Sequence, residues 1–245
     1  MDDAADAATK PIRHGESYPQ LISLAVHELR TPASVVGGYL RMLQRDSDPP
    51  LGERQRKMID EAAKSCGRLV ELVAELSDIG KLDAGLTTIA REPLDFFSLV
   101  EEVAGHVHEA ADREVRLELR GPAVGARTMG DSARLGAAIQ ALLRAIMREM
   151  PSPSVVVAER RVGTGARSGS AVLVIAREDV VQSAYEAEAA AFDEKRGGLG
   201  LALPIARRVI GAHGGRLTAP ASSGSDSEVA ARGAAVVTIP LETNR

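Results

Sequence analysis

One stretch, residues 21–44, constrains the fold more than any other part of the chain. Its sequence is LISLAVHELRTPASVVGGYLRMLQ. Apolar or small residues recur in it at intervals of three and four, or their sum, at Ile22, Ala25, Leu29, Val36, Tyr39 and Leu43. This spacing places one apolar stripe on an α-helix and is typical of helices that pack in a bundle. We therefore expect one long helix from about 17 to 45.

His27 is the candidate reactive side chain in this helix. It lies two residues from both Ala25 and Leu29, so it is expected to point roughly opposite the stripe, toward solvent. A solvated imidazole is a nucleophile at neutral pH, and Glu28 is placed to hold one ring nitrogen and accept a proton. Pro32 removes a backbone N–H and is expected to bend the helix just past this point. A lone histidine is more often an ordinary surface residue, and that alternative stands beside the chemical one.

A second helix is expected from about 53 to 83, after the breaker sequence RDSDPPLG. Its apolar stripe consists of Ile59, Ala62, Cys66, Leu69, Val73, Leu76 and Ile79. Two such helices cannot bury both stripes well alone, so a homodimeric four-helix bundle is expected. The alternative is a hairpin that packs on its own C-terminal domain. Cys66 is the single cysteine, which excludes an intrachain disulfide, and its place on the stripe predicts a core position.

The rest of the chain alternates strand-like and helix-like stretches. Strands are expected at EVRLELR, SVVVAER, AVLVIA and AAVVTIP, and helices at about 95–110, at about 131–149 and within GGLGLALPIARRVIGAHGG. Asp95 is the expected N-cap of the first of these helices. His106 and His108 lie on it two residues apart, so they face different directions and no shared metal site is expected.

This order of elements predicts an α+β protein with two domains. Residues 1–16 read as a loose polar tail, 17–85 as the helical hairpin, and 92–245 as an α/β sandwich. The net charge of −4 gives no electrostatic reason to expect nucleic-acid binding. The chain contains no apolar run of about 20 residues and no signal-peptide pattern, so we expect a cytoplasmic protein without a membrane segment.

The motif HELRTP followed by GGYL resembles the phospho-acceptor box of two-component sensor histidine kinases. Nearly the whole chain, from about 17 to 241, is similar to their dimerisation and phosphotransfer domain followed by an ATPase domain of the GHKL (Bergerat) type. The resemblance implies that His27 is the phosphoacceptor and Glu28 the acid/base that orients it. It also implies that Thr31 helps position water for dephosphorylation. The implied partner is the receiver domain of a response regulator.

Two further stretches resemble the nucleotide-binding motifs of the same family. GGLGLALPIARRVIGAHGG looks like the second glycine box, in which Gly198 and Gly200 would let backbone N–H groups approach phosphate at a helix N-terminus. A tight turn is the plainer alternative. GDSARLGAAIQALLRAIMREMPSP follows the box whose asparagines hold magnesium, but this chain has Ala141 and Ala145 at the matching positions. Alanine offers no oxygen ligand, so no metal site is expected, while Arg148 keeps a cation near the phosphates.

The first glycine box also departs from the family pattern. In the family a strand runs into Asp-x-Gly-x-Gly, and the aspartate binds the adenine amino group. The matching alignment here puts Ala176 at the aspartate and Glu178 and Val180 at the glycines. Glu178 or Asp179 would reach the site only if this register slips. The following lid segment, at 182–196, is short, rich in Ala and Glu, and expected to be partly helical.

The two halves therefore predict different things about function. The leading hypothesis is a phosphotransferase, or a phosphatase of the regulator, that exchanges phosphoryl groups between His27 and a response-regulator aspartate. Its ATPase domain is expected to be degenerate, with ATP and magnesium bound weakly. One alternative is an active ATP-dependent sensor histidine kinase with an unusual nucleotide site. Another is a non-catalytic dimeric scaffold, although a scaffold would need neither His27 nor Glu28 and Thr31.

Overall fold

A computed structural model describes residues 14–45, 50–107, 114–195, 198–221 and 233–242. The chain divides into two compact units, Met1–Leu86 and Thr87–Arg245. Each unit is described separately below. Most of the tail expected at 1–16 lies outside the described residues, as does His108, which the sequence analysis expected on the first sandwich helix.

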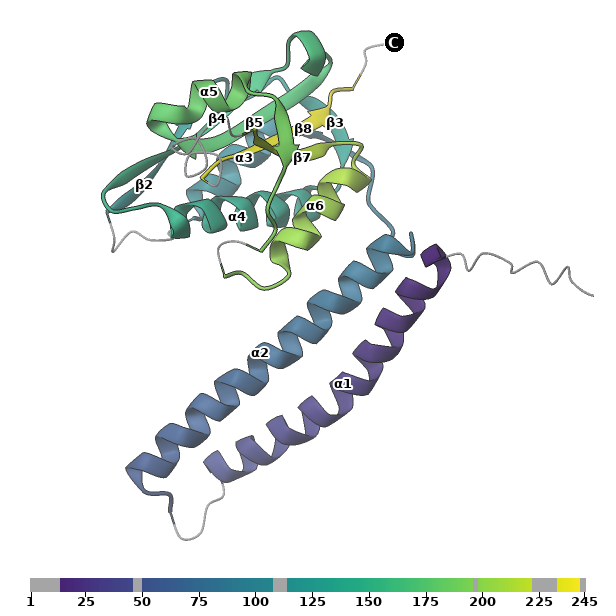
Figure 1. The fold of residues 1–245 in the computed structure, drawn as a ribbon, viewed down its shortest axis with the longest axis vertical. Coiled ribbons are helices and arrows are strands. Elements are labelled where there is room, and N and C mark those ends of the chain that lie inside the picture. The colour runs from purple at the N-terminus through teal and green to yellow at the C-terminus, as the bar shows by residue number, and fades with distance from the viewer. Residues whose placement is uncertain (1–13, 46–49, 108–113, 196–197, 222–232, 243–245) are drawn as a thin grey trace, which may run out of the picture. The chain divides into compact units, whose positions relative to one another are not determined.

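The first unit is a helical hairpin, as its stripes predicted (Figure 1). Helix α1 spans His14–Arg45 and continues through Pro32, and helix α2 spans Glu53–Asp83. Near the connection, the Gln44 side chain donates a 2.8 Å hydrogen bond to Asp60 across the hairpin. Gly52 precedes α2, and its N–H donates a 3.0 Å hydrogen bond to the Gln55 side chain, so the start of this helix is stabilised locally.

The two helices pack through a different line of α1 than the expected stripe. Ile22 is the one stripe residue of α1 that is buried in the single chain, whereas Leu29, Val36 and Tyr39 are 51%, 52% and 65% exposed. Small residues bring the helices together instead. A Cβ added to Gly80 would lie only 2.9 Å from the Ile22 side chain. One added to Gly37 would lie 3.3 Å from Sγ of Cys66, on α2.

On α2 the packing follows the expected stripe more closely. Cys66, Val73 and Ile79 are buried, while Leu69 is 56% exposed. The core position expected for Cys66 is confirmed, and its thiol donates a 3.2 Å hydrogen bond to the Ala33 carbonyl. The hairpin therefore buries one line of each helix and leaves a second apolar line in solvent.

The second unit is built on a six-stranded sheet with strand order β2-β4-β5-β8-β7-β6. Its strands are β2 (Val115–Arg120), β4 (Ser154–Val162), β5 (Ser170–Arg177), β6 (Ala189–Ala191), β7 (Arg216–Pro220) and β8 (Ala235–Pro240). Only β2 and β4 pair in parallel. A separate antiparallel pair consists of β1 (Glu92–Asp95) and β3 (Arg127–Gly130).

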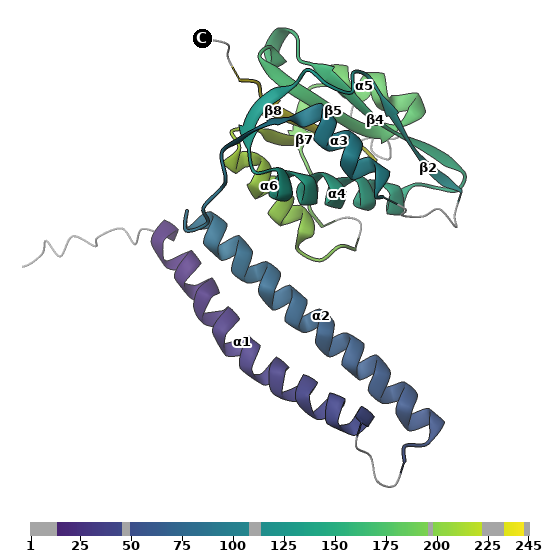
Figure 2. The ribbon, with the colours of Figure 1, turned by 180° about the vertical axis from the view of Figure 1, so that it is seen from behind.

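Helices cover this sheet unequally on its two faces. The layer on one face contains α3 (Phe96–Gly105), α4 (Ser132–Glu149) and α6 (Ala202–Ala212), and the short α5 (Val181–Glu186) lies over the other (Figures 1 and 2). The expected α/β sandwich is thereby confirmed, although α3 ends at Gly105, earlier than the expected 110.

Aspartates are the N-caps of the first two helices of this layer, Asp95 of α3 and Asp131 of α4. The N-cap expected at Asp95 is confirmed, because one carboxylate oxygen accepts from the N–H groups of Phe97 and Ser98 at 3.0 and 3.2 Å. The other oxygen accepts from Gly125 and Ala126, so the same side chain also fixes the loop before β3. Burial raises the pKa of Asp95, but these four hydrogen bonds outweigh it and hold the pKa below the usual value.

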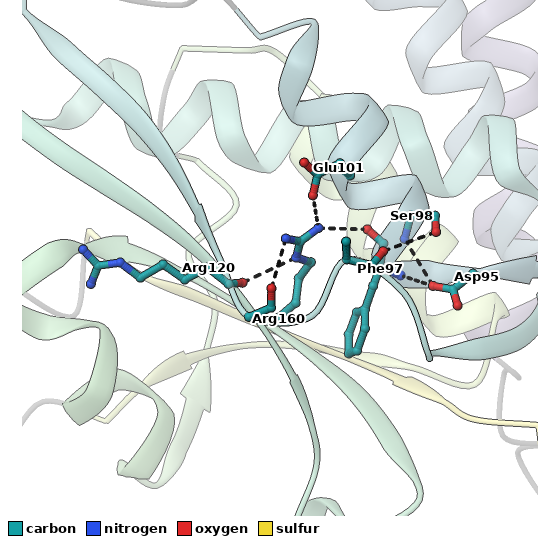
Figure 3. Close-up of polar contacts among 8 residues, drawn as sticks. Asp95, Phe97, Ser98, Glu101, Arg120 and Arg160 are labelled. Carbon is teal, nitrogen blue, oxygen red and sulfur yellow. Dashed lines mark hydrogen bonds and ion pairs between the residues drawn. The ribbon is translucent and has the colours of Figure 1, made fainter.

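A buried arginine joins α3 to the sheet (Figure 3). The Arg160 side chain, on β4, is only 4% exposed and forms an ion pair with Glu101. Its guanidinium also donates to the carbonyl oxygens of Phe97 and Gly121, each at 3.3 Å. Gly121 has φ +83, and a Cβ there would collide with the Arg160 carbonyl oxygen, so only glycine fits this turn. Arg160 thus fixes the helix-facing side of β4.

Candidate phosphotransfer site and nucleotide-type unit

His27 lies on α1 with its side chain 81% exposed, as its position relative to the stripe predicted. Its Nδ1 lies 3.4 Å from a carboxylate oxygen of Glu28, whose side chain is 72% exposed. With Nδ1–H donating to this carboxylate, the lone pair of Nε2 points into solvent. The structure therefore brings two of the three expected phosphotransfer residues into contact, in a place that a partner protein can reach.

Thr31 is one helical turn beyond His27 on the same helix, and it is also exposed. Residues four apart lie on the same helix face, so Thr31 and His27 share one exposed face of α1. Leu24 and Val35, which are 59% and 51% exposed, flank this face on the same helix. His27 thus lies on a surface that combines polar and apolar side chains.

The residues expected at the magnesium box lie on α4 in the second unit. Ala145 is completely buried, and Ala141 and Arg148 are half-buried. The positions i, i+4 and i+7 place all three on one side of the helix. The side chains of Ala141 and Ala145 on this side of the helix are methyl groups, which offer no oxygen ligand to a metal ion.

Gly198 and Gly200 lie in the loop that leads into α6. Their φ angles are +59° and +64°, in the left-handed region that favours glycine. A Cβ added to Gly198 would meet no atom within 4 Å, so the backbone there is open to approach. The loop has the conformation that the sequence analysis associated with phosphate approach, and a tight turn has the same backbone signature.

The end of β5 places Ala176 and Arg177 on opposite faces of the sheet. Ala176 is completely buried and packs in a cluster with Val174 and with Val181 of α5, on the α5 side of the sheet. Side chains alternate along a strand, so the next residue, Arg177, belongs to the opposite face, which it shares with Arg160 and the helix layer. The helix-facing position at the end of β5 is therefore Arg177, whereas the alignment made on sequence puts the family's aspartate at Ala176.

Arg177, Glu178 and Asp179 form ion pairs within the chain. The Arg177 guanidinium donates two hydrogen bonds, at 2.5 and 2.6 Å, to the two carboxylate oxygens of Asp179. This ion pair lowers the pKa of Asp179 below its usual value. Glu178 pairs with Arg120 of β2. The sequence analysis considered Glu178 and Asp179 as substitutes for the missing aspartate. Each of them is paired with an arginine of the chain.

Among the described residues, no group of three or more His, Cys, Asp and Glu side chains is arranged to hold a metal ion. The described helices include none that is both long enough and apolar enough to span a membrane. The sequence analysis did not identify the ion pair of Arg177, because the face on which this residue lies depends on the pairing of β5 with β4.

Comparison with known proteins places this geometry in a class. Residues 20–85, which include His27, match the family described as "His Kinase A (phospho-acceptor) domain". A probable sensor histidine kinase of Mycobacterium tuberculosis, TcrY, is 31% identical over 214 residues, which cover 84% of this chain and 43% of that protein. The sensor histidine kinase MtrB of Mycolicibacterium paratuberculosis is 28% identical, covering 89% of this chain and 40% of that protein. This chain thus spans less than half the length of these relatives.

Solved structures share the fold at low sequence identity. The full-length ShkA structure in complex with AMPPNP has a TM-score of 0.65 at 22% identity and covers 92% of this chain and 46% of that one. The histidine kinase AdeS of Acinetobacter baumannii has a TM-score of 0.55 at 18% identity, covering 89% and 98%. The fold and the phospho-acceptor helix define a protein with a phosphotransfer hairpin and an ATPase-type sandwich. The chain belongs to the family of two-component sensor histidine kinases.

Proposed function

We propose that this chain exchanges phosphoryl groups between His27 and an aspartate of a response-regulator receiver domain, and does so without efficient self-phosphorylation from ATP. The observation that carries the proposal is the exposed His27 imidazole with Nδ1 in contact with Glu28, inside a phospho-acceptor domain. Such a side chain is accessible to a docked protein and has its second ring nitrogen available for attack.

The chemistry follows from this arrangement. The Nε2 lone pair attacks the phosphorus of an aspartyl phosphate, the bond from phosphorus to the carboxylate oxygen breaks, and the carboxylate leaves with the electron pair. The imidazole then carries a phosphoryl group on Nε2 and a proton on Nδ1, which the Glu28 carboxylate stabilises. Because both groups form high-energy phosphates, positioning supplies most of the rate enhancement.

Dephosphorylation of the regulator is the second expected outcome at the same surface. Thr31 is exposed one turn from His27, where its hydroxyl can hold a water molecule close to a phosphoryl group on the partner. Attack by that water instead of Nε2 releases inorganic phosphate and restores the aspartate. Competition between these two nucleophiles would set the balance between transfer and hydrolysis.

The second unit supports the limit on ATP use. Ala141 and Ala145 supply no oxygen for magnesium, and Arg177 cannot accept a hydrogen bond from an adenine amino group. An active ATP-dependent kinase remains a second candidate, and the observation that favours it is the left-handed backbone at Gly198 and Gly200 before α6. A pure scaffold is the third candidate and gives no reason for the contact between His27 and Glu28.

Radiolabel transfer tests the proposal directly. A panel of receiver domains charged with radiolabelled acetyl phosphate is mixed with the full chain, and the chain is assayed for acid-labile, base-stable label. We expect His27→Ala to abolish labelling and Glu28→Ala to slow it. We expect Thr31→Ala to preserve labelling while slowing phosphate release by about a hundredfold, because the water loses its positioning group.

His106→Ala is the matched control, because His106 is an exposed histidine of the other unit. It is expected to label like the unchanged chain. Label that persists in His27→Ala would place the acceptor elsewhere and contradict the proposal. Rapid labelling from ATP and magnesium alone would favour the second candidate.

A further inference from the structure

The segment that follows β5, residues 177–191, is held in place from several sides by this chain's own side chains. Val181 and Ala184 of α5 are 6% and 3% exposed and pack against Val157 and Val174 of the sheet. This apolar contact fixes one side of α5. A six-residue helix is too short to be stable by itself, so its order must come from such tertiary contacts.

Tyr185 provides the second attachment of α5. The guanidinium carbon of Arg161, on β4, lies 4.5 Å from the centre of the Tyr185 ring, and that of Arg167 lies 5.0 Å from it. Both distances are within the range of a cation–π interaction. The Thr164 hydroxyl lies 3.3 Å from the tyrosine hydroxyl. We call Arg161, Arg167 and Tyr185 the tyrosine clamp.

Arg167 also holds the C-terminal end of α5. It donates hydrogen bonds to the carbonyl oxygens of Tyr185 and Ala187, at 2.5 and 3.5 Å. The last carbonyls of a helix have no partner within the helix, and a cation is favourable at that end. Arg161 reaches the first turn of the same helix through a 2.6 Å hydrogen bond to Gln182. The two arginines therefore hold both ends of α5.

The turn between β5 and α5 is also closed by the chain itself. Arg177 pairs with Asp179 and Arg120 pairs with Glu178, so both acidic residues of the turn have partners. Among the described residues other than glycine, only Glu114 has a positive φ, so this turn carries no left-handed residue. Every attachment found in this segment is thus internal to the protein.

From these contacts we propose that the tyrosine clamp is an internal latch, which keeps residues 181–191 ordered whether or not a nucleotide is bound. The clamp links β4 and the loop after it to α5 and to Ala187, the residue that follows this helix. The second unit then presents one fixed surface rather than a segment that orders on ligand binding. This inference is independent of phosphoryl transfer at His27.

Hydrogen–deuterium exchange on the full chain tests the latch, with peptides covering 178–191 measured with and without ATP and magnesium. We expect slow exchange in this segment without nucleotide and no further slowing when nucleotide is added. Arg167→Met and Tyr185→Leu keep the apolar part of each side chain and remove the clamp. We expect each to raise exchange in 181–191 by about tenfold, while β5 and α4 are unchanged.

Arg116→Met is the matched control, because Arg116 is an exposed arginine on a strand of the same unit. It is expected to leave exchange in 181–191 unchanged. The latch is overturned if the segment of the unchanged chain exchanges like an unfolded peptide until ATP is added. It is overturned equally if the clamp variants have no effect, or if they raise exchange evenly over the whole unit. Label transfer at His27 is measured separately, so failure of either proposal is recognised without the other.

Discussion

Arg160 is a charged residue of the second unit whose side chain is almost completely buried. A guanidinium taken out of water is unfavourable unless its donors are satisfied. Here one side is paired with Glu101, and the remaining donors reach carbonyl oxygens of α3 and of the turn after β2. The Glu101 carboxylate is itself 53% exposed, so it stays partly hydrated while it neutralises the buried charge. The ion pair with Glu101 and the hydrogen bond to Phe97 are directional, so they orient α3 on the sheet in addition to the burial of its apolar side chains.

We expect Arg160→Met to destabilise the protein by about 3 kcal/mol, because the carbonyl oxygens of Phe97 and Gly121 lose their donors inside the fold. For a protein of this size the thermal midpoint should fall by roughly 6–12 °C, as measured by circular dichroism. Glu101→Gln is the matched change on the exposed partner and should cost less than about 1 kcal/mol. Equal effects of the two variants would show that the ion pair, and not the carbonyl network, carries the stability.

At the scale of elements, the hairpin has an apolar line that its own chain does not cover. Leu29, Val36, Tyr39 and Leu43 are all about half exposed or more. These residues belong to the stripe that the sequence assigned to a bundle, so we expect a second copy to cover them. Light scattering on the full chain should give twice the chain mass of 25.8 kDa.

Charged substitutions on this line test which face is used. Leu29→Glu combined with Val36→Glu should raise the dissociation constant of the dimer by about a hundredfold or more, because carboxylates would be buried without partners. Leu24→Glu, an equally exposed leucine off the line, should leave the dimer intact. A monomer at micromolar concentration for the unchanged chain would contradict the bundle.

Elements whose signals are local were predictable from sequence, and those that depend on distant partners were not. Asp95 marked its helix start because an aspartate cap acts within three residues. The stripe of α1 did not reveal which line packs on α2, because the close approach depends on Gly37 and Gly80 facing residues of the other helix. Strand β6 consists of three alanines and carries no β-branched signal, so only its pairing with β7 defines it.

The same limit applies to the two faces of the sheet at the end of β5. Which residue faces the helix layer follows from the pairing with β4, where Val156 lies opposite Arg177 and Val157 opposite Ala176. One residue of shift exchanges the two faces of a strand. Sequence motifs alone cannot resolve such a shift when the motif residues themselves have been replaced.

Across the whole molecule, the two units differ in the side chains that they offer for phosphoryl chemistry. The hairpin has an exposed His27 with its acidic neighbour, while the second unit has Ala141 and Ala145 on α4 and an ion pair between Arg177 and Asp179. Phosphoryl transfer from ATP depends on charge neutralisation around the phosphates, whereas transfer from an aspartyl phosphate can use groups of the receiver domain. We therefore propose that this chain exchanges phosphoryl groups with a regulator rather than phosphorylating itself.

Calorimetric titration with ATP and magnesium tests whether the second unit binds nucleotide weakly. We expect a dissociation constant above about 1 mM for the unchanged chain, which corresponds to less than about 4 kcal/mol of binding free energy. Restoring the lost groups should recover affinity. A chain with Ala141→Asn, Ala145→Asn, Arg177→Asp and Asp179→Gly should bind more tightly, because oxygen ligands and an acceptor for the adenine amino group return.

The matched control carries the same other changes, but with Ala176→Asp in place of Arg177→Asp. The two chains distinguish the position given by the strand register from the position given by the sequence alignment. Residue 176 faces α5, so an aspartate there should not reach the base and should destabilise the cluster around Val174 and Val181 instead. Tighter ATP binding with aspartate at 176 than at 177 would show that the alignment, and not the strand register, identifies the base-binding position. A low-micromolar dissociation constant for the unchanged chain would show that other groups have replaced the lost contacts, and the active-kinase candidate would then be favoured.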